Sequence, residues 1–492
     1  MNHKISVEQF KLLIFSIFTS LVTYGFTLTN FSLSIDSETP VYSDFSLTLG
    51  RWGTNLVRYH IFEGHLPYFT LLLGLLLLSL TSVELSRLFK FNGTTGYLFC
   101  ALFLTFPQLA YQLIFTMQAD VVPLGFLFST LAVSLFLEST NTFFSFKSIS
   151  CFFISALLIM FIVALYQGLV LIPVIIYIII FFQNTFEENF SFKLEIRKTL
   201  YFAGVMALGL VLYYVSVKII CPPVDGGYLS SYLTGNSDNQ FSNSVSIWFE
   251  NLTGKFYYGE KLFIIATGIS LVLFVKFIIQ KQLFVLRFLT LFTLLLVPFG
   301  FSFLITNGYH PPRIYVTSGI VFGFVIVHFI STLKWEKVTI WAVSLICITN
   351  IYFVTNLFYS NYKIFNHDKD TARKIDNLIQ TKYPNFDPNI NYVYFYGCLP
   401  YEHHGRYRLD KSEAFGGSLF SWDNGDNYRI INFFKFNDIN YYKMIDNKET
   451  YLKIKDSIEP MPIWPNQESI KLINDVLVVK LGTTKGTALW VE

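Results

Sequence analysis

Residues 152–183 read "FFISALLIMFIVALYQGLVLIPVIIYIIIFFQ" and contain no charged side chain. A transmembrane helix needs only about 20 apolar residues, so this stretch is longer than one span requires. The tripeptide Tyr166–Gln167–Gly168 interrupts it, and Lys or Arg residues flank both outer ends. We interpret the stretch as two short spans, 152–165 and 169–183, joined by a tight hairpin. The alternative is one long tilted helix, which would reverse the orientation of every later loop.

Apolar runs recur on both sides of this stretch. The chain has 492 residues, of which 53% are hydrophobic and 14% are charged, whereas soluble proteins average about 25% charged residues. The composition therefore predicts a polytopic membrane protein, mostly α-helical, with about eleven transmembrane helices. The predicted spans are 11–32, 67–86, 95–114, 121–138, 152–165, 169–183, 200–220, 262–280, 285–305, 314–332 and 339–358.

The distribution of charge predicts how these spans are oriented. Lys and Arg are concentrated in the short connections on one side, which we assign to the cytoplasm together with the N-terminus. The opposite connections, 33–66, 221–261 and 306–313, are richer in acids, Gly and aromatic residues. An odd number of spans then leaves the C-terminal tail outside the cytoplasm. The net charge is only +3 and there is no basic tract, so no nucleic-acid partner is expected.

The tail from residue 359 has a different composition. Polar residues dominate it, and Ala372, Ile375 and Ile379 recur at the spacing of an amphipathic helix, which we place over 367–382. The segments "NYVYFYG" (391–397) and "DVLVVKLG" (475–482) are rich in β-formers and end in Gly, so we expect strands. The chain is therefore divided into a membrane body, 1–358, and a small α/β domain, 359–492.

The first outer loop carries a cluster of acids in a chain that is poor in charge. "FSLSIDSETPVYSD" (31–44) contains Asp36, Glu38 and Asp44. The simplest explanation is a solvated loop, but carboxylates at a membrane surface also suit a general base. Asp36 and Glu38 are two residues apart, so in an extended segment their side chains point the same way. Asp44 is the expected bystander.

Cations and aromatic residues follow in the same loop. Residues 48–69, "TLGRWGTNLVRYHIFEGHLPYF", are predicted to form an interfacial amphipathic helix that carries Arg51, Trp52, Arg58 and His60. A second group lies in "TNGYHPPRIY" (306–315). There His310 and Arg313 stand next to a rigid Pro-Pro pair at the outer end of a span. The fork of an arginine matches the oxygens of a phosphate, although anchoring at the membrane surface is the simpler role. Further outer turns hold the secondary candidates Asp120, Tyr166 and Gln167.

Several motifs are missing from the sequence. It has no Walker A loop, no G-x-G-x-x-G after a predicted strand, no H-E-x-x-H and no G-x-S-x-G. The five cysteines show no C-x-x-C spacing, so we predict no metal site and no other cofactor. Cys221 and Cys398 fall in segments assigned to the same side of the membrane, which leaves a disulfide between them open.

The order of four short motifs resembles a known family. "SIDSE" (34–38), "LGRWG" (49–53), "HPPR" (310–313) and "GGSLFSWDNG" (416–425) are similar in order and placement to the type II glucosyl transferases of O-antigen modification, which are serotype-converting membrane enzymes of bacteria and prophages. The resemblance implies a GT-C-type helical body in the bacterial inner membrane, with its active site and C-terminal domain in the periplasm. It implies undecaprenyl-phosphate glucose as the donor and lipid-linked O-antigen, the precursor of lipopolysaccharide, as the acceptor.

The resemblance also suggests roles for individual residues. The resemblance implies that Asp36 or Glu38 is the essential acid. It implies that Arg313 binds the donor phosphate, and His310 and Arg51 are further candidates for this role. One carboxylate base without a second carboxylate as nucleophile implies inversion at the anomeric carbon. The candidates for binding the acceptor sugar are Trp52, Trp422, Ser418, Asp423 and Arg429.

Two other functions are compatible with a polytopic chain that has large outer loops. A lipid-linked glycan flippase or transporter would need polar groups in mid-membrane, and the predicted spans contain few ionisable residues. An O-antigen polymerase is the other alternative, and the polar C-terminal tail argues against it.

Overall fold

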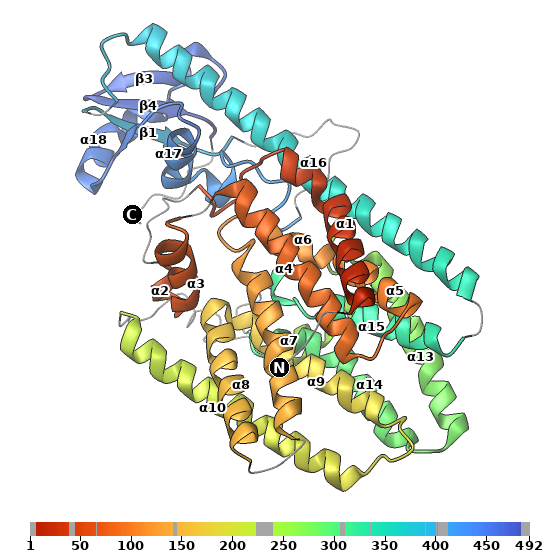
Figure 1. Ribbon diagram of the computed structural model, residues 1–492. Helices are drawn as coiled ribbons and strands as arrows, with labels where there is room; N and C mark the ends of the chain where they lie inside the picture. Colours follow the sequence, from red (N-terminus) through yellow and green to blue (C-terminus); the bar gives the residue numbers. More distant parts are fainter. Residues whose placement is uncertain are drawn as a thin grey trace. The chain divides into compact units, whose positions relative to one another are not determined.

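The structure is a computed structural model that describes residues 6–38, 45–64, 66–140, 145–222, 240–305, 310–333, 336–388, 390–399, 401 and 412–483. The chain is mostly helical, with a small sheet near the C-terminus (Figure 1). It divides into two compact units. Unit 1 comprises Met1–Thr29 and Tyr42–Thr355, and unit 2 comprises Asn30–Val41 and Asn356–Glu492. Unit 2 therefore includes the start of the first predicted outer loop.

Unit 1 contains the helices that are long and apolar enough to cross a membrane. Within the described residues there are nine such candidate spans, and the last of them extends into unit 2. Two shorter apolar helices accompany them, α5 (Thr94–Thr105) and α15 (Ser318–Ser331). Each of the eleven predicted spans overlaps one of these helices, but only nine of the helices in the described ranges are long enough to be candidate spans. The helices of the nine spans are α1 (Val7–Thr29), α4 (Pro67–Leu88), α7 (Val121–Ser139), α8 (Phe146–Leu165), α9 (Leu171–Asn184), α10 (Phe192–Ile220), α13 (Phe263–Gln280), α14 (Phe284–Leu296) and α16 (Glu336–Lys382).

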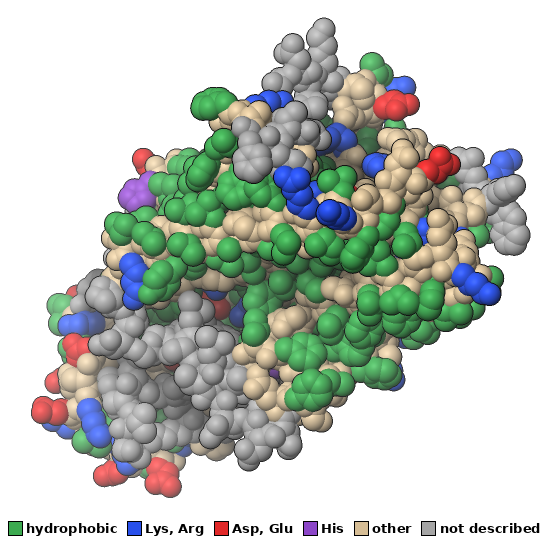
Figure 2. Space-filling model, turned by 90° about the horizontal axis from the view of Figure 1, so that it is seen from below, with side chains coloured by type: hydrophobic (Ala, Val, Ile, Leu, Met, Phe, Trp, Pro, Cys, Tyr) green, Lys and Arg blue, Asp and Glu red, His purple; other side chains and the backbone are tan. Residues whose placement is uncertain are grey.

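Many large hydrophobic side chains of these helices are exposed. On α10 they include Leu200, Val211 and Ile219, and on α13 they include Leu271 and Ile279. In the face seen in Figure 2, hydrophobic side chains cover broad bands of the described surface. Contiguous apolar surface of this kind is unstable in water and suits contact with lipid. The protein is thus a membrane protein by the character of its helices.

The interruption at Tyr166–Gly168 is present in the structure. Helix α8 ends at Leu165, and Tyr166 has an extended backbone with φ −161° and ψ 121°. A 3-10 turn, η3 (Gln167–Val170), then leads into α9. Residues 152–183 therefore form two helices, and the alternative of one continuous helix is excluded.

The predicted span 95–114 is wrong in its extent. Helix α5 ends at Thr105, and Phe106 is extended with φ −65° and ψ 124°. The cause is Pro107, because a proline disfavours helical geometry in the residue before it. The chain continues as a 3-10 turn, η2 (Pro107–Leu109), and one helical turn, α6 (Ala110–Leu113).

The predicted break between the last span and the tail helix is also wrong. A single helix of 47 residues, α16 (Glu336–Lys382), covers both segments, and residues 356–382 of it belong to unit 2 (Figure 1). The sequence contains no Gly or Pro between residues 336 and 383, so the change from apolar to polar composition occurs without a helix breaker. The expected amphipathic spacing is confirmed, since Ala372, Ile375 and Ile379 are buried in the core of unit 2.

Unit 2 contains a four-stranded sheet with the order β2-β1-β4-β3. Strand β1 is parallel to β2 and β4, and β3 is antiparallel to β4. The predicted strands at 391–397 and 475–482 are confirmed as β1 and β4. The strands are β1 (Tyr392–Tyr396), β2 (Lys443–Met444), β3 (Ile470–Ile473) and β4 (Val476–Lys480).

Helices cover both faces of this sheet. Val393 and Phe395 of β1 pack with α16 and α17 (Asn427–Phe436) in one cluster of buried residues. Tyr394, which alternates with them, packs with α18 (Lys448–Ile458) in a second cluster. The chain passes from β1 through α17 to β2 and then through α18 to β3 and β4. The unit is a three-layer α/β fold wound on both sides of β1.

Glycines allow close backbone approach at the carboxyl ends of β1 and β4. Gly397 and Gly425 have φ +84° and +82°, and a Cβ added at Gly425 would lie 2.2 Å from the carbonyl oxygen of Gly397. A Cβ at Gly482 would lie 2.2 Å from the carbonyl oxygen of Cys398. The side chain of Asn427 then hydrogen-bonds both the N–H and the carbonyl oxygen of Phe395, at 2.7 Å each. These contacts fix the start of α17, which carries Arg429, at the carboxyl end of β1.

Candidate functional site

The segment that carries Asp36 and Glu38 is anchored on α16. The Asn361 side chain donates to the Ser32 hydroxyl at 2.9 Å and to the Leu33 carbonyl oxygen at 3.3 Å. The Ser37 N–H donates to the Ser34 carbonyl oxygen, and Asp36 has φ +70°, so the segment is a turn. The expected extended conformation is therefore wrong. Left-handed geometry costs energy in residues other than Gly, although Asp tolerates it better than most.

The two acids nevertheless meet at one arginine. Arg429 Nη2 donates to Asp36 Oδ1 at 3.0 Å, and Arg429 Nη1 donates to Glu38 Oε1. Arg429 Nε donates to Asp423 Oδ2 at 2.5 Å. All of these residues belong to unit 2. Three carboxylates thus share one guanidinium, and we call this group the Arg429 centre.

The carboxylates of the Arg429 centre differ in exposure. The Asp36 side chain is 45% exposed, whereas the Glu38 side chain is 0% exposed. Burial raises the pKa of Glu38 to about 7, against the opposing effect of the Arg429 charge, and the neighbouring Asp36 adds to the rise. Glu38 Oε2 is buried and has no hydrogen-bond partner among the described residues. The centre therefore combines an accessible carboxylate with a buried one that titrates near neutral pH.

The other tail candidates lie nearby in the chain but have different surroundings. The Ser418 hydroxyl is buried, donates to Asp368 Oδ1 at 2.8 Å and accepts from the Phe420 N–H at 3.1 Å. Trp422 is half-buried, and its indole ring lies against Gly417, where an added Cβ would be 2.5 Å from the ring. Asp423 belongs to the Arg429 centre. The structure thus groups Asp423 and Arg429 with the two loop acids, and it places Ser418 in the interior of unit 2.

In unit 1 the "LGRWG" motif is held by the turn after α8. Arg51 Nε donates to Gln167 Oε1 at 2.9 Å, and the guanidinium lies 4.7 Å from the centre of the Tyr166 ring. Gln167 Nε2 in turn donates to the Leu49 carbonyl oxygen at 2.7 Å and to the Tyr213 hydroxyl at 3.0 Å. The structure therefore brings Arg51 of the first outer loop together with Tyr166 and Gln167 of the turn after α8.

Trp52 begins the short helix α3 (Trp52–Asn55), which continues as a π-helical stretch, η1 (Leu56–Ile61). Its indole Nε1 donates to the Ser216 hydroxyl at 2.9 Å, and its ring meets Phe161 edge to face at 5.6 Å. A Cβ at Gly53 would lie 3.0 Å from the carbonyl carbon of Ala164, so only glycine fits this contact comfortably. The prediction of one interfacial helix over 48–69 is thus wrong in its extent. The continuous helical stretch covers residues 52–61, and it packs against α8 and α10.

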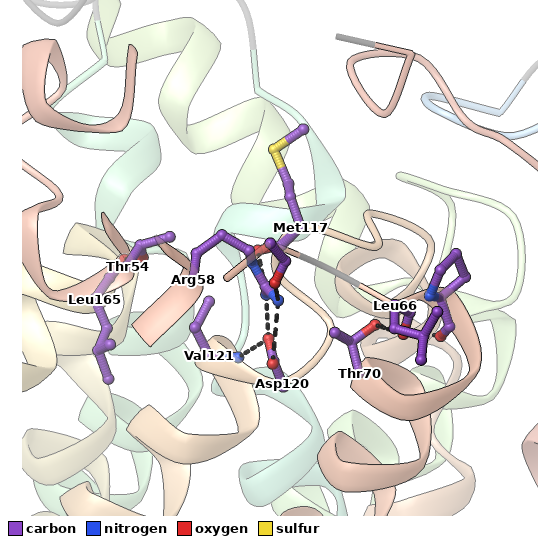
Figure 3. Close-up of polar contacts among 10 residues, drawn as sticks. Thr54, Arg58, Leu66, Thr70, Met117, Asp120, Val121 and Leu165 are labelled. Atoms are coloured by element: carbon purple, nitrogen blue, oxygen red, sulfur yellow. Dashed lines mark hydrogen bonds and ion pairs between the residues drawn. The ribbon is translucent and has the colours of Figure 1, made fainter. Parts of the chain in front are cut away.

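Arg58 of η1 forms a buried ion pair with Asp120 (Figure 3). The two side chains are 1% and 2% exposed. Arg58 Nη2 also donates to the Met117 carbonyl oxygen at 2.9 Å, and Asp120 Oδ1 accepts from the Val121 N–H at 2.8 Å. Asp120 caps the N-terminus of α7, where the helix dipole favours a negative charge. The secondary candidate Asp120 is therefore a satisfied carboxylate.

His310 and Arg313 flank a Pro-Pro pair before α15. The Arg313 guanidinium lies 4.8 Å from the centre of the Phe115 ring. The backbone of this turn is fixed by Gln108 and Gln112, whose amides donate to the carbonyl oxygens of Pro312 and Arg313 at 3.3 and 2.6 Å. His310 is partly buried, and burial lowers its pKa, so the imidazole is neutral at pH 7.

Three further predictions concern Asp44, the cysteines and metal binding. Asp44 lies outside the described residues. Cys221 and Cys398 are free thiols, as are the other three cysteines. In the described ranges, no group of three or more His, Cys, Asp or Glu side chains is arranged to hold a metal ion.

Sequence reasoning missed two features of these sites. The pairing of Glu38 with Arg429 joins residues 391 positions apart, and no local pattern reports such a contact. The predicted interfacial amphipathic helix carries Arg58 without a partner, although Arg58 directly follows Leu56 and Val57 in "NLVRYHIF" (55–62). A lone cation among apolar residues is a usable signal, because a buried charge requires a partner of opposite sign.

Comparison with protein families adds to this geometry. A family model described as "Glucosyl transferase GtrII" matches residues 25–328, which include Asp36, Arg51, Asp120 and Arg313. Comparisons with curated proteins and with solved structures gave no match. The family match covers more than half of the chain and agrees with the resemblance of the short motifs. The chain belongs to the glucosyl transferase GtrII family.

Proposed function

We propose that the protein transfers glucose from undecaprenyl-phosphate glucose to a sugar hydroxyl of lipid-linked O-antigen. Membership of a glucosyl transferase family supports the transfer of a glucosyl group. The apolar helices support a donor that is itself embedded in the membrane. The proposed partners are the lipid donor, the lipid-linked acceptor and the surrounding membrane lipids.

The observation that carries the proposal is the Arg429 centre. Asp36 is the accessible carboxylate, and we assign it the role of general base. Glu38 and Asp423 hold the Arg429 guanidinium, which in turn fixes the Asp36 carboxylate. The left-handed backbone of Asp36 fits this assignment, because strained residues are concentrated at functional sites.

The proposed reaction is a single displacement at the anomeric carbon. The acceptor oxygen forms a bond to that carbon while the bond from the carbon to the phosphate oxygen breaks. The proton of the acceptor hydroxyl passes to Asp36, and undecaprenyl phosphate leaves with the electron pair. Attack from the side opposite the leaving phosphate inverts the configuration of the sugar. A positioned base contributes about 10²–10⁴-fold to the rate of such a step.

The leaving phosphate needs positive charge or hydrogen-bond donors. Arg313 and Arg51 are the proposed ligands, since their guanidinium groups match phosphate oxygens, and His310 is proposed as a neutral hydrogen-bond partner. We propose that these side chains suffice and that the reaction uses no metal or other cofactor. Trp52, Trp422, Asp423 and Arg429 remain the proposed residues for the acceptor sugar, whereas Ser418 is left out because its hydroxyl is buried and hydrogen-bonded to Asp368.

The proposed location is the bacterial inner membrane, with the reacting groups and unit 2 in the periplasm. This orientation rests on the concentration of Lys and Arg in the short connections. An alkaline phosphatase fusion after residue 365 should be active, whereas activity of only a cytoplasmic reporter there would reverse the orientation.

Mass spectrometry of lipopolysaccharide tests the function. Cells that express the protein should carry one added hexose per O-antigen repeat, and cells without the gene or with Asp36→Asn should carry none. An unchanged repeat mass with the protein present in the membrane would refute the proposal.

A further inference from the structure

The buried pair of Arg58 and Asp120 has no role in the chemistry proposed above. We propose that these two are positioning residues, which hold Arg51 in the orientation that binds the donor phosphate. This inference rests on the proposed function of Arg51.

Arg58 joins separate parts of unit 1. Its guanidinium contacts the Gly64 carbonyl oxygen at 3.3 Å, the Met117 carbonyl oxygen at 2.9 Å, and both carboxylate oxygens of Asp120. Figure 3 shows the end of the Arg58 side chain between Met117 and Asp120. One side chain therefore fixes the loop that follows η1 to the turn before α7 and to Asp120, the N-cap residue of α7.

A short stretch of chain connects Arg58 to Arg51. Helix α3 begins at Trp52 and runs without interruption into η1, so Arg51, the N-cap residue of α3, directly precedes the helical stretch that carries Arg58. This stretch is held at one end by Arg58 and at the other by the Arg51–Gln167 hydrogen bond. Between them, the Thr54 hydroxyl donates to the Leu165 carbonyl oxygen at 2.5 Å. Loss of the Arg58 contact leaves one end of the stretch unheld, and the Arg51 guanidinium then moves with it.

Burying the Arg58–Asp120 pair costs desolvation free energy. Taking two charges out of water is expensive, and apolar side chains of similar volume often stabilise a protein as well or better. A buried pair is therefore better explained by the fixed geometry that it imposes than by stability alone. The π-helical turn points the same way, because such turns are frequent at functional sites. Lys90 and Glu187, by contrast, form an exposed pair with no such restraint on the backbone.

A double-mutant cycle with a short-chain polyprenyl-phosphate glucose as the probe tests the inference. The full-length protein, purified in nanodiscs, would be titrated with the probe as wild type, Arg58→Lys and Asp120→Asn. We expect each variant to raise the dissociation constant of the probe by about 10-fold or more, because misplaced binding groups lose affinity steeply. In an Arg51→Lys background, the same substitutions should change it by less than about 2-fold, because the residue that they position is already impaired.

Several outcomes decide between positioning and a purely structural role. Equal losses in both backgrounds, or an equal loss of acceptor binding, would overturn the inference. Glu84→Gln is the matched control, since it breaks the Arg87–Glu84 pair at the other end of α4 and should leave probe binding unchanged. If Asp120→Asn does not fold, Asp120→Glu takes its place, because it keeps the charge and shifts its position. It should raise the dissociation constant of the probe in the wild-type background and not in the Arg51→Lys background. If the wild type does not bind the probe, the proposed function fails instead.

Discussion

The Arg58–Asp120 pair of unit 1 and the Arg429 centre of unit 2 are built differently. In unit 1, Arg58 meets one carboxylate, both side chains are at most 2% exposed, and backbone groups satisfy further hydrogen bonds. In unit 2, Arg429 meets three carboxylates, and Asp36 among them is 45% exposed. The first centre is closed and balanced in charge, whereas the second is partly open and has an excess of acid.

This difference separates positioning from chemistry. A closed pair has no group to offer a substrate, and its energy goes into fixing the backbone around it. An open centre with excess carboxylates can accept a proton and still keep its arginine paired. Burial, and to a smaller extent the neighbouring Asp36, raises the pKa of Glu38 to about 7, so the buried carboxyl group of this centre changes its charge near neutral pH.

The largest effect is expected from Arg429→Met, which leaves the acids of unit 2 without their common partner. Transfer activity should fall by about 10³-fold, and unit 2 should lose about 3 kcal/mol of stability, because the buried Glu38 carboxylate loses its partner, whereas Asp36 and Asp423 are about half exposed and stay hydrated. Arg429→Lys should retain more of both. Hexose transfer and thermal unfolding would be measured on the same preparations. Wild-type activity in Arg429→Met would show that the Arg429 centre is not the reacting site.

Arg313→Lys sharpens the comparison from the side of the donor. A lysine keeps the charge but cannot make two parallel contacts with a phosphate, so we expect the specificity constant for the donor to fall by about 10-fold or more. Arg58→Lys should act on the donor as well, although Arg58 contacts no substrate in this account. Steady-state kinetics with varied donor would check this. A fully active Arg313→Lys at normal protein level would remove Arg313 from the donor site.

The pH dependence of activity should report Glu38. Its pKa is raised to about 7, so below that pH the carboxyl is protonated and no longer holds Arg429 as an ion pair. Activity should therefore rise with pH through about 7. Stability should change in the opposite direction, because a raised carboxyl pKa means that the folded unit loses stability as pH rises from about 4.5 to about 7. Glu38→Gln should flatten both profiles at this point, and unaltered profiles in that variant would assign the titration elsewhere.

The smallest effect on chemistry is expected from Trp422→Ala. The ring is half-buried and packs against the core of unit 2, so its loss should cost about 2 kcal/mol of stability. If Trp422 also stacks on the acceptor sugar, the acceptor KM should rise while donor binding is unchanged. Circular dichroism would confirm that the unit stays folded. An unchanged acceptor KM in a folded variant would limit Trp422 to packing.

Much of the helical unit could be predicted from the sequence, because the thickness of a bilayer sets the length of each apolar run. The break at Tyr166–Gly168 could be predicted for the same reason. The end of α5 at Thr105 cannot be predicted from hydropathy, because Pro107 acts on the backbone of the residue before it and leaves the run apolar. The continuity of α16 cannot be predicted from composition, because the polarity of the chain changes along the helix while both segments keep the backbone geometry of a helix.

The acids and cations of the site could be predicted individually but not as pairs. Asp36, Glu38, Asp423 and Arg429 were all candidates, and their chemistry follows from residue type. Their common centre depends on the fold of unit 2, which joins residues 30–41 to the chain beyond 356. The same holds for Arg58 and Asp120, because 62 positions separate them. Pairing of this kind is decided by tertiary structure.

The most direct measurement compares Asp36→Asn with Asp120→Asn in one assay of glucose transfer from polyprenyl-phosphate glucose. Both substitutions remove one carboxylate charge, one from the open centre and one from the closed pair. We predict that Asp36→Asn lowers kcat by about 10²–10⁴-fold and leaves donor binding near the wild-type value. Asp120→Asn should raise the donor KM and retain most of kcat when donor is saturating. A near wild-type kcat in both Asp36→Asn and Glu38→Gln would contradict the claim that the Arg429 centre supplies the general base.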